Sequence, residues 1–381
     1  MNRLVIIGNG FDMAHGLKTS YMDFINWYWD RRVDAFVGNT SNVSEDCLCK
    51  LTIKDSSNLS CWNGFAFENS YFKDIRGNKT YSGYEVITEL QKYPDIFSVN
   101  TTPFFETILQ SIETKGWVDI ENDYYQLLKR TTEKTDCGYT IKELNEQLGF
   151  LQSKLVEYLG TLTVSEPIST ILDAIKDNIR VEDLSTEGKT LAKTMGVIEY
   201  DTNSFDDNRY MDERFSEMPP ERTMLLCFNY TGTVKGYEQY GGFILNYIHG
   251  ELEHPEHIIF GYGDELDKDY QGILDKQDNE LLKNVKSVKY LETKNYHKML
   301  DFLIAAPFQV LIMGHSCGNS DRTLLNTIFE HENCVSIKPF YHKRDDGSDN
   351  YLELVQNISR NFTNMQLYRD RVVNKEQCLT M

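Results

Sequence analysis

The segment that most constrains the fold lies at the start of the chain. Four consecutive apolar residues, Leu4-Val5-Ile6-Ile7, are followed by Gly8-Asn9-Gly10-Phe11-Asp12. An uninterrupted apolar run predicts a buried strand of a parallel sheet, and Gly-x-Gly directly after it predicts a sharp turn into a helix. Such a turn can bring backbone N–H groups against a phosphate, so a nucleotide is the first ligand to expect.

The same turn departs from the dinucleotide fingerprint of dehydrogenases. That fingerprint needs a third glycine at a fixed offset, and His15-Gly16 breaks the spacing. An ordinary dehydrogenase is therefore disfavoured. Glycines that serve only to relax the backbone geometry of the turn remain the alternative to a phosphate site.

The composition is that of a folded globular protein with an acidic balance. The chain has 381 residues, of which 40% are hydrophobic, enough for a large core and more than one domain. Its 58 acidic and 39 basic residues give a net charge of −19, so no general attraction to nucleic acids or anionic lipids is expected. A local basic groove is compatible with this net charge, but nothing in the sequence indicates one.

The cellular setting is predicted from what the sequence does not contain. The apolar run near the N-terminus is too short for a signal peptide, and no stretch is long enough to span a bilayer, so we expect a cytoplasmic protein. The eight cysteines are scattered, without Cys-x-x-Cys spacing. Cys47, Cys49 and Cys61 form a loose cluster of unassigned role, for which free thiols are favoured over metal binding.

The middle of the chain differs from its ends in composition and in hydrophobic periodicity. Aromatic and apolar residues at helical spacing predict a helix over 20–34 that Ser20 can cap, whereas residues 36–100 look like an insertion with long loops. Helical patterns return over 104–179, including a helix that Asp119 caps and that carries exposed acids such as Glu121. Residues 181–219 are acidic and polar and look like a linker.

After the linker, apolar runs again end in polar or glycine motifs. Strands are predicted over residues 223–228, 244–248, 258–260 and 310–313. The motifs that follow these strands are Asn229-Tyr230-Thr231, His249-Gly250, Gly261-Tyr262-Gly263-Asp264 and Gly314-His315-Ser316. Ligands of open α/β sheets bind beyond the carboxyl ends of the strands, so we expect these motifs to converge.

Single residues of these motifs leave alternatives open. His249 suits a general base in a cleft, but an isolated histidine at a strand end is commonly structural. A metal site of His249, His254 and His257 is disfavoured because Pro255 breaks any helical face. Gly314-His315-Ser316-Cys317-Gly318 matches the nucleophile turn of esterases, but too few residues follow Ser316 to carry the remaining catalytic groups.

Taken in order, these motifs resemble the bacteriophage abortive-infection AbiH family. The resemblance runs from residue 3 to about residue 330 and rests on five motifs. They are the opening turn with residues 14–21, residues 117–121, Phe228-Asn229-Tyr230-Thr231, Ile248-His249-Gly250, and Gly314-His315-Ser316 with Ser320-Asp321. Membership would imply a role in antiphage defence.

The order of motifs is also similar, more remotely, to sirtuin-like NAD-binding domains. That resemblance implies two catalytic residues, Asn229 to orient the ribose or a water and His249 to act as the base. It further implies a cofactor-binding set: Gly8, Asn9, Gly10, Phe11, Asp12, Ser20, Gly314, His315, Ser316 and Asp321. Sirtuins carry a zinc module with paired Cys-x-x-Cys motifs that this chain lacks, so peptide deacetylation is not expected. Cleavage of the nicotinamide–ribose bond needs a base and a positioned water but no metal, so no metal is expected.

Together these inferences predict an α/β protein with a Rossmann-like, sirtuin-like sheet, mostly parallel and flanked by helices. Residues 1–35 and 220–381 would form the nucleotide-binding core, and residues 36–219 a mainly helical insertion. The expected activity is hydrolysis of NAD at the nicotinamide–ribose bond during phage infection. The alternative is a non-catalytic nucleotide-binding sensor whose insertion recognises a phage or host protein; a homo-oligomer stays open, and a nuclease is disfavoured by the charge balance.

Overall fold

The computed structural model describes residues 1–37, 42–54, 83–115, 119–133, 137–195, 198–200, 213–215 and 218–381. These residues form two compact units. The first comprises Met1–Lys18, Leu162–Gln277 and Asn284–Met381, and the second comprises Thr19–Thr161 and Asp278–Lys283. The division falls after residues 18 and 161, whereas the sequence placed it after residues 35 and 219. The predicted helix near residue 20 therefore groups with the insertion, and residues 162–219 group with the sheet.

The first unit is built on a five-stranded parallel sheet. Its strands are β1 (Asn2–Ile7), β7 (Thr223–Cys227), β8 (Ile244–Tyr247), β9 (Phe308–Met313) and β10 (Cys334–Phe340), in the spatial order β10-β9-β1-β7-β8. Numbered along the chain, this is the 3-2-1-4-5 order of doubly wound nucleotide-binding sheets. The register pairs Val5 of the central strand with Leu225 on one side and Leu311 on the other. The predicted Rossmann-like α/β fold is confirmed.

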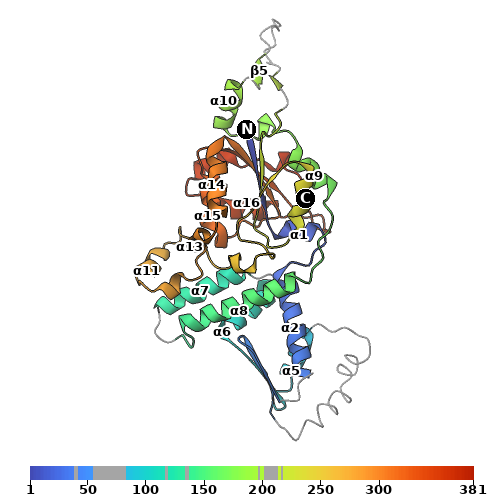
Figure 1. Ribbon diagram of the computed structural model, residues 1–381, viewed down its shortest axis with the longest axis vertical. Helices are drawn as coiled ribbons and strands as arrows, with labels where there is room; N and C mark the ends of the chain where they lie inside the picture. The colour runs from blue at the N-terminus through green and yellow to red at the C-terminus, as the bar shows by residue number, and fades with distance from the viewer. Residues whose placement is uncertain are drawn as a thin grey trace. The chain divides into compact units, whose positions relative to one another are not determined.

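Alternating side chains of the strands supply two hydrophobic layers. Leu4 and Ile6 face the layer that contains Met299, Leu325 and Ile358 from the helices around α14 to α16. In the other layer, the neighbouring residues of β1 pack against the α9 side of the sheet. Figure 1 shows α14 and α15 on one side of the sheet and α9 on the other. Both faces of the sheet are covered, which explains the continuous apolar runs in the sequence.

One predicted strand is wrong, and another strand escaped prediction. Ile258, Ile259 and Phe260 are buried but lie in irregular backbone, so their apolar run reflects burial of the side chains and not a strand. The fifth strand is β10, whose apolar pattern is interrupted by Lys338 and Pro339. It lies at the edge of the sheet, where a proline is tolerated.

Helices and short 3₁₀ turns connect the strands of the first unit. Two further short strands, β5 (Ile198–Tyr200) and β6 (Glu213–Phe215), pair with each other. The helices and turns are α1 (Asn9–Ala14), α9 (Ser169–Lys176), η2 (Val181–Asp183), α10 (Thr186–Thr194), η3 (Thr233–Tyr240), η4 (Pro255–His257), α11 (Tyr270–Leu274), α13 (Lys286–Lys289), η5 (Tyr290–Glu292), α14 (Asn295–Ala305), η6 (Asn319–Asp321), α15 (Arg322–Phe329), α16 (Tyr351–Arg360), α17 (Met365–Arg371) and η7 (Lys375–Gln377).

The second unit is mainly helical, as predicted, and also holds a small antiparallel sheet of β2 (Val43–Glu45), β3 (Cys49–Ile53) and β4 (Phe97–Thr101). Its helices are α2 (Tyr21–Val37), α5 (Gly83–Gln91), α6 (Pro103–Lys115), α7 (Ile120–Glu133), α8 (Ile141–Leu159) and α12 (Asn279–Leu282). Ser20 and Asp119 bind the first turns of α2 and α7 as predicted, through the N–H groups of Asp23 and Asn122.

Two predictions in this unit need correction or lie outside the described residues. Glu121 and Asp123 of α7 are buried, although the sequence predicted exposed acids on this helix. Trp117 and Cys61 fall outside the described residues. Cys49 is buried and accepts a hydrogen bond from Arg32 Nε, with 3.3 Å between the two atoms. Within the described segments, no helix has the length and apolar character needed to cross a membrane.

Candidate functional site

The polar motifs of the first unit meet at one edge of the sheet. Strands β1, β7, β8 and β9 are parallel, so the residues that follow them all leave the sheet at its carboxyl edge. The chain reverses its direction of winding between β1 and β9, the point at which doubly wound sheets bind their ligands. The turns that begin at Gly8 and Gly314 lie at that point.

These two glycine turns are in direct backbone contact. The N–H of Gly10 donates to the carbonyl oxygen of Gly314 over 2.8 Å, and the N–H of Gly8 donates to that of Met313 over 3.1 Å. Gly314 has a φ of 74°, and a Cβ there would collide with the backbone nitrogen of Phe11. The glycines therefore allow two loops to approach closely, and the N–H groups of Gly8 and Gly10 are already used within the protein.

Beside these turns, Asp321 is the centre of a buried polar network. Its Oδ1 lies 2.7 Å from Lys286 Nζ and 3.3 Å from His249 Nε2, and its Oδ2 lies 3.4 Å from His315 Nε2. All four residues are less than a tenth exposed. They come from the loops after β8 and β9, from α13 and from η6, so the fold joins groups that the sequence separates.

The charges around Asp321 decide its ionisation. Burial by itself would raise the pKa of the carboxyl group. Lys286, followed by His249 and His315, outweighs burial and holds the pKa of Asp321 well below its usual range. Asp321 is therefore a carboxylate at neutral pH, and its charge is offset by the buried ammonium of Lys286.

His249 is held in its neutral form. Burial and the nearby charge of Lys286 lower the pKa of His249 to about 3, although Asp321 acts in the opposite direction. Nε2 lies 3.1 Å from the hydroxyl oxygen of Tyr290, and the two rings stack with 6.0 Å between their centroids. The ring also hydrogen-bonds to the backbone of Phe228. Nδ1 makes this hydrogen bond, because Nε2 faces Tyr290 and Asp321. Nε2 then carries the lone pair and accepts a hydrogen bond from the hydroxyl of Tyr290.

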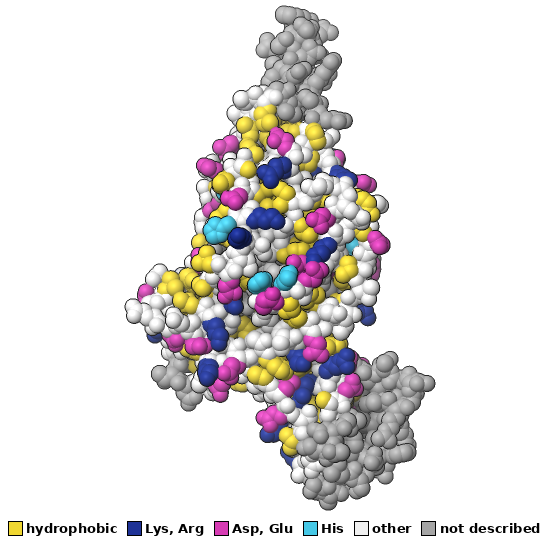
Figure 2. All heavy atoms as spheres, in the orientation of Figure 1, with side chains coloured by type: hydrophobic (Ala, Val, Ile, Leu, Met, Phe, Trp, Pro, Cys, Tyr) yellow, Lys and Arg dark blue, Asp and Glu magenta, His cyan; other side chains and the backbone are white. Residues whose placement is uncertain are grey.

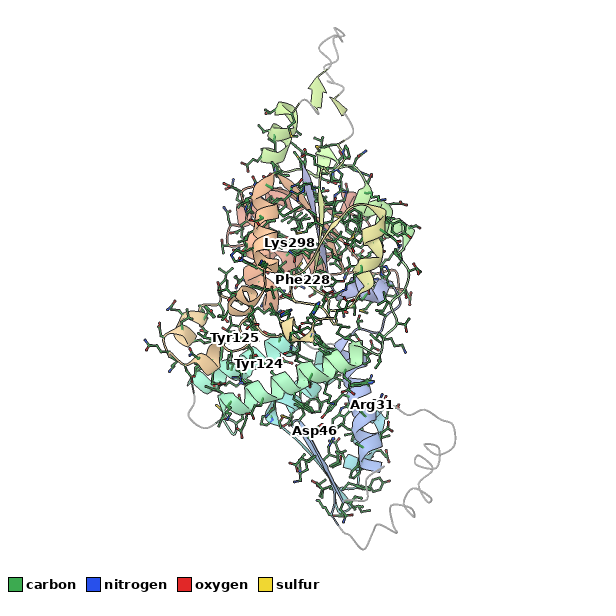
Figure 3. The ribbon with its side chains drawn as sticks, viewed as in Figure 1. Arg31, Asp46, Tyr124, Tyr125, Phe228 and Lys298 are labelled. Atoms are coloured by element: carbon green, nitrogen blue, oxygen red, sulfur yellow. The ribbon has the colours of Figure 1, made fainter. Side chains whose placement is uncertain are left out.

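His315 adopts the opposite tautomer. Its Nδ1 accepts a hydrogen bond from the N–H of Cys317 over 3.0 Å, so Nε2 carries the proton that points toward Asp321. Cys317 has a φ of 54°, a strained conformation for a residue with a side chain, and this turn sets the position of the imidazole. Phe228, labelled in Figure 3, has its ring against those of both His249 and His315.

A second buried acid, Asp12, lies in a different environment at the same edge. Its Oδ2 accepts a hydrogen bond of 2.6 Å from the hydroxyl of Thr231, and among the described residues its Oδ1 has no hydrogen-bond partner. Burial raises the pKa of Asp12 against the effect of that hydrogen bond. Asn229 anchors the neighbouring loop, because its Nδ2 donates to the carbonyl oxygen of Gly8 over 2.9 Å.

The other predicted residues are distributed more widely. Phe11 is buried in the core against His15 and Tyr237, whereas Asn9 and Ser316 are exposed at the surface. Ser20 belongs to the second unit, where it binds Asp23. The structure thus groups His249, His315 and Asp321, and it places Asn229, Gly8 and Asp12 in an adjoining group.

Three residues of this edge were not anticipated from the sequence. Lys286 and Tyr290 complete the network around Asp321, and Arg322 Nη1 lies 3.3 Å from Oδ2 of the buried Asp264. Asp264 follows the Gly261-Tyr262-Gly263 motif that the sequence had singled out. Arg322 directly follows Asp321 in the sequence, and this position beside a predicted site residue could have identified it.

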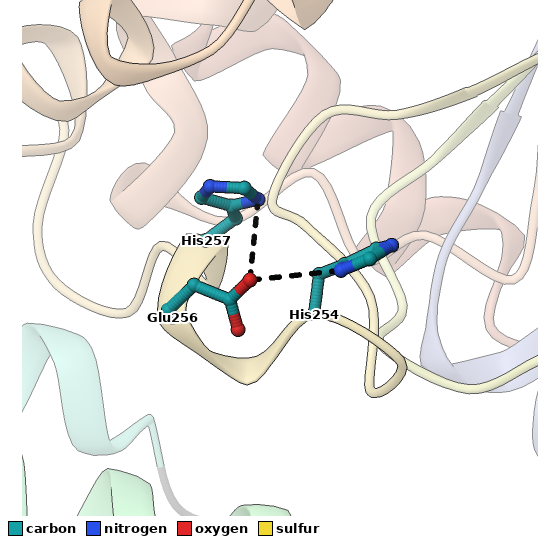
Figure 4. A group of neighbouring side chains, drawn as sticks. All are labelled: His254, Glu256 and His257. Carbon is teal, nitrogen blue, oxygen red and sulfur yellow. Dashed lines mark ion pairs between the residues drawn. The ribbon is translucent and has the colours of Figure 1, made fainter.

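The loop after His249 brings together residues that can ligate a metal. Nδ1 of His254 lies 3.6 Å and Nδ1 of His257 lies 4.0 Å from Oε1 of Glu256 (Figure 4). The sequence predicted no metal because Pro255 breaks a helical face, yet a 3₁₀ turn that begins at this proline gathers the three side chains. All three are exposed, and their contacts are those of surface ion pairs.

The fold and this edge define a Rossmann-like α/β protein with a buried histidine–carboxylate–lysine network where such proteins hold their ligands. The model of the family "Bacteriophage abortive infection AbiH" matches residues 4–342. The chain therefore belongs to this family, which supports a role in abortive infection of phage-infected cells. Searches of curated proteins and of solved structures gave no match to the chain.

Proposed function

We propose that this abortive-infection protein hydrolyses NAD at the bond between nicotinamide and ribose when a phage infects the cell. One observation carries the proposal: at the carboxyl edge of a Rossmann-like sheet, a neutral His249 lies 3.3 Å from the carboxylate of Asp321. Loss of NAD would halt metabolism and thereby stop phage replication.

In this reaction the C–N bond breaks and its electron pair leaves with nicotinamide. A water molecule adds to the ribose carbon and gives its proton to Nε2 of His249. Asp321, which remains ionised, stabilises the imidazolium that forms. Asn229 donates its Nδ2 hydrogen to Gly8 and keeps its Oδ1 as an acceptor for the ribose or the water.

The burial of these groups sets a condition on catalysis. His249 is 3% exposed and Asp321 is 8% exposed, so side chains over the network must move before a substrate reaches it. Such a requirement accords with an activity that stays off until infection. Low dielectric also strengthens the interaction between the imidazolium and the carboxylate.

The test compares cells and purified protein. Bacteria that express the chain are infected with a phage whose growth it blocks, and NAD, nicotinamide and ADP-ribose are followed over time. We expect NAD to fall before lysis and ADP-ribose to appear. His249→Gln and Asn229→Asp should lower the rate at least 100-fold, the usual contribution of a general base or a positioning group.

His254→Gln is the matched control, since His254 is an exposed histidine on the loop that follows His249. It should retain full activity, and the melting temperatures of all variants should be compared. Infection that aborts while NAD stays constant would refute the proposal. Full activity of the folded His249→Gln protein would refute the role of His249.

A second candidate function is a nucleotide-binding sensor without turnover. The observation in its favour is the low pKa of His249, about 3, because so weak a base takes up a proton poorly at neutral pH. Calorimetry with NAD would then show saturable binding, and chromatography of the same sample would show no nicotinamide.

A further inference from the structure

At the opposite edge of the sheet, the first unit holds a pocket of about 550 Å³. Its apolar floor is formed by Met224 near the start of β7, Ile244 at the start of β8 and Phe302 of α14. These are the amino ends of the strands, whereas His249 and Asp321 lie beyond the carboxyl ends. The pocket is therefore separate from the proposed catalytic site.

The rim of the pocket carries a concentration of positive charge. Lys294, His297, Lys298 and Asp301 line it at the spacing of one helix face, and Arg222 adds a guanidinium from the segment before β7. Three cations face one carboxylate here, although the whole chain has a net charge of −19. Figure 2 shows dark blue and cyan side chains close together over the α14 region, and Figure 3 labels Lys298 on this helix.

These cations are placed by the fold. Arg222 lies over the ring of Phe302, with 5.9 Å from the guanidinium carbon to the ring centroid. Lys298 Nζ lies 2.7 Å from the carbonyl oxygen of Leu245. Within the described residues no carboxylate lies within ion-pair distance of Arg222, Lys294 or Lys298. The rim thus carries a net positive charge, with three cations and the single carboxylate of Asp301.

We propose that this pocket binds a phosphorylated small molecule of nucleotide size. Lysine and arginine side chains suit a phosphate group, and the apolar floor suits a planar ring. The volume is within the usual range for small-ligand pockets. A long nucleic acid fits less well, since positive charge is confined to one pocket and the rest of an acidic protein repels a polyanion.

Aromatic rings connect α14, which lines the pocket, with His249. Tyr296, next to His297, stacks on Tyr290 with 5.3 Å between centroids, and Tyr290 stacks on His249. Asn295 at the start of α14 donates from Nδ2 to the carbonyl oxygen of Tyr247, two residues before His249. A ligand that binds His297 of α14 therefore lies next in sequence to Tyr296, the first ring of a stack that ends at His249.

The test is calorimetry of the full-length protein with AMP, adenosine and inorganic phosphate. We expect one saturable site for AMP whose affinity falls with salt. Adenosine and inorganic phosphate should each bind at least ten-fold more weakly, because each lacks one half of the ligand. The double variant Lys294→Ala/Lys298→Ala should weaken AMP binding at least ten-fold, whereas His254→Gln, at an exposed histidine outside the pocket, should leave it unchanged.

Lys268→Ala/Lys276→Ala removes the same charge from exposed positions elsewhere in the unit and is the matched control. It should bind AMP as the unmodified protein does. Equal binding by the Lys294→Ala/Lys298→Ala protein, with an unchanged melting temperature, would overturn the proposal. So would the absence of saturable AMP binding, equal affinity for inorganic phosphate, or binding of a DNA oligonucleotide alone.

Discussion

Asp321 and Asp12 are both buried at the carboxyl edge of the same sheet, yet their pKa values shift in opposite directions. Asp321 is surrounded by Lys286, His249 and His315, and its pKa is lowered. Asp12 is bound by the hydroxyl of Thr231, and its pKa is raised. Burial disfavours both charges, so the difference comes from the neighbouring nitrogen bases. A buried acid alone therefore says little about a site until its partners are known.

The largest expected effect comes from removing the cation that sets the charge of Asp321. Lys286→Met leaves a buried carboxylate without its ammonium and should lower the free energy of unfolding by about 3–5 kcal/mol, measured in urea. Lys283→Met, which removes one partner of an exposed pair with Glu280, should cost less than about 1 kcal/mol. Equal costs would show that Lys286 is not required to hold Asp321 ionised.

Asparagine at each of the two acids tests the comparison directly. Asp321→Asn removes the charge that balances Lys286 and should cost about 3 kcal/mol at pH 7. Asp12→Asn should change stability by about 1 kcal/mol or less, since the folded protein already disfavours the charge of Asp12. A larger loss for Asp12→Asn than for Asp321→Asn would reverse the assignment of the two acids.

The titration of His249 should make the protein less stable as the pH falls. Its pKa is about 3 in the folded protein and near 6.5 when unfolded, so between these values the unfolded chain binds one more proton. Unfolding free energy should therefore fall by about 1.4 kcal/mol per pH unit as pH drops below 6.5. His249→Gln should flatten this slope, and His254→Gln should not. Asp12 contributes with the opposite sign, because its raised pKa favours proton binding by the folded state.

The smallest expected effect is at the hydroxyl that binds Asp12. Thr231→Val keeps the shape of the side chain and removes the 2.6 Å hydrogen bond, so we expect a loss of about 1 kcal/mol. Thr223→Val, at a buried threonine in β7, is the reference substitution. No difference between the two would mean that the hydrogen bond to Asp12 adds nothing to stability.

The sheet was predictable because its signals are local. Apolar runs before Gly8, Asn229, His249 and Gly314 mark four of the five strands, and parallel strands must place their ends at one edge. The fifth strand was missed because Lys338 and Pro339 interrupt its pattern, and its lysine is paired with Asp183 from far along the chain.

The network was only half predictable, for a reason that Lys286 makes plain. Lys283, Lys286 and Lys289 recur every three residues, and nothing nearby distinguishes the buried one. Its burial depends on Asp321, which lies 35 residues further on and reaches it only through the fold. The glycine turns show the converse. Their spacing was visible in the sequence, but the hydrogen bonds from the N–H groups of Gly8 and Gly10 to the carbonyl groups of Met313 and Gly314 were not.

The central position of β1 has a consequence for synthesis. This strand leaves the ribosome before its two neighbours in the sheet, which begin at Thr223 and Phe308. At about 5–20 residues per second, the last of them follows after roughly 15–60 s. Asp321 emerges later still, so a half-made chain has neither the sheet nor the network. The network around Asp321 thus forms only late in translation, because β1 has nothing to pair with until most of the chain exists.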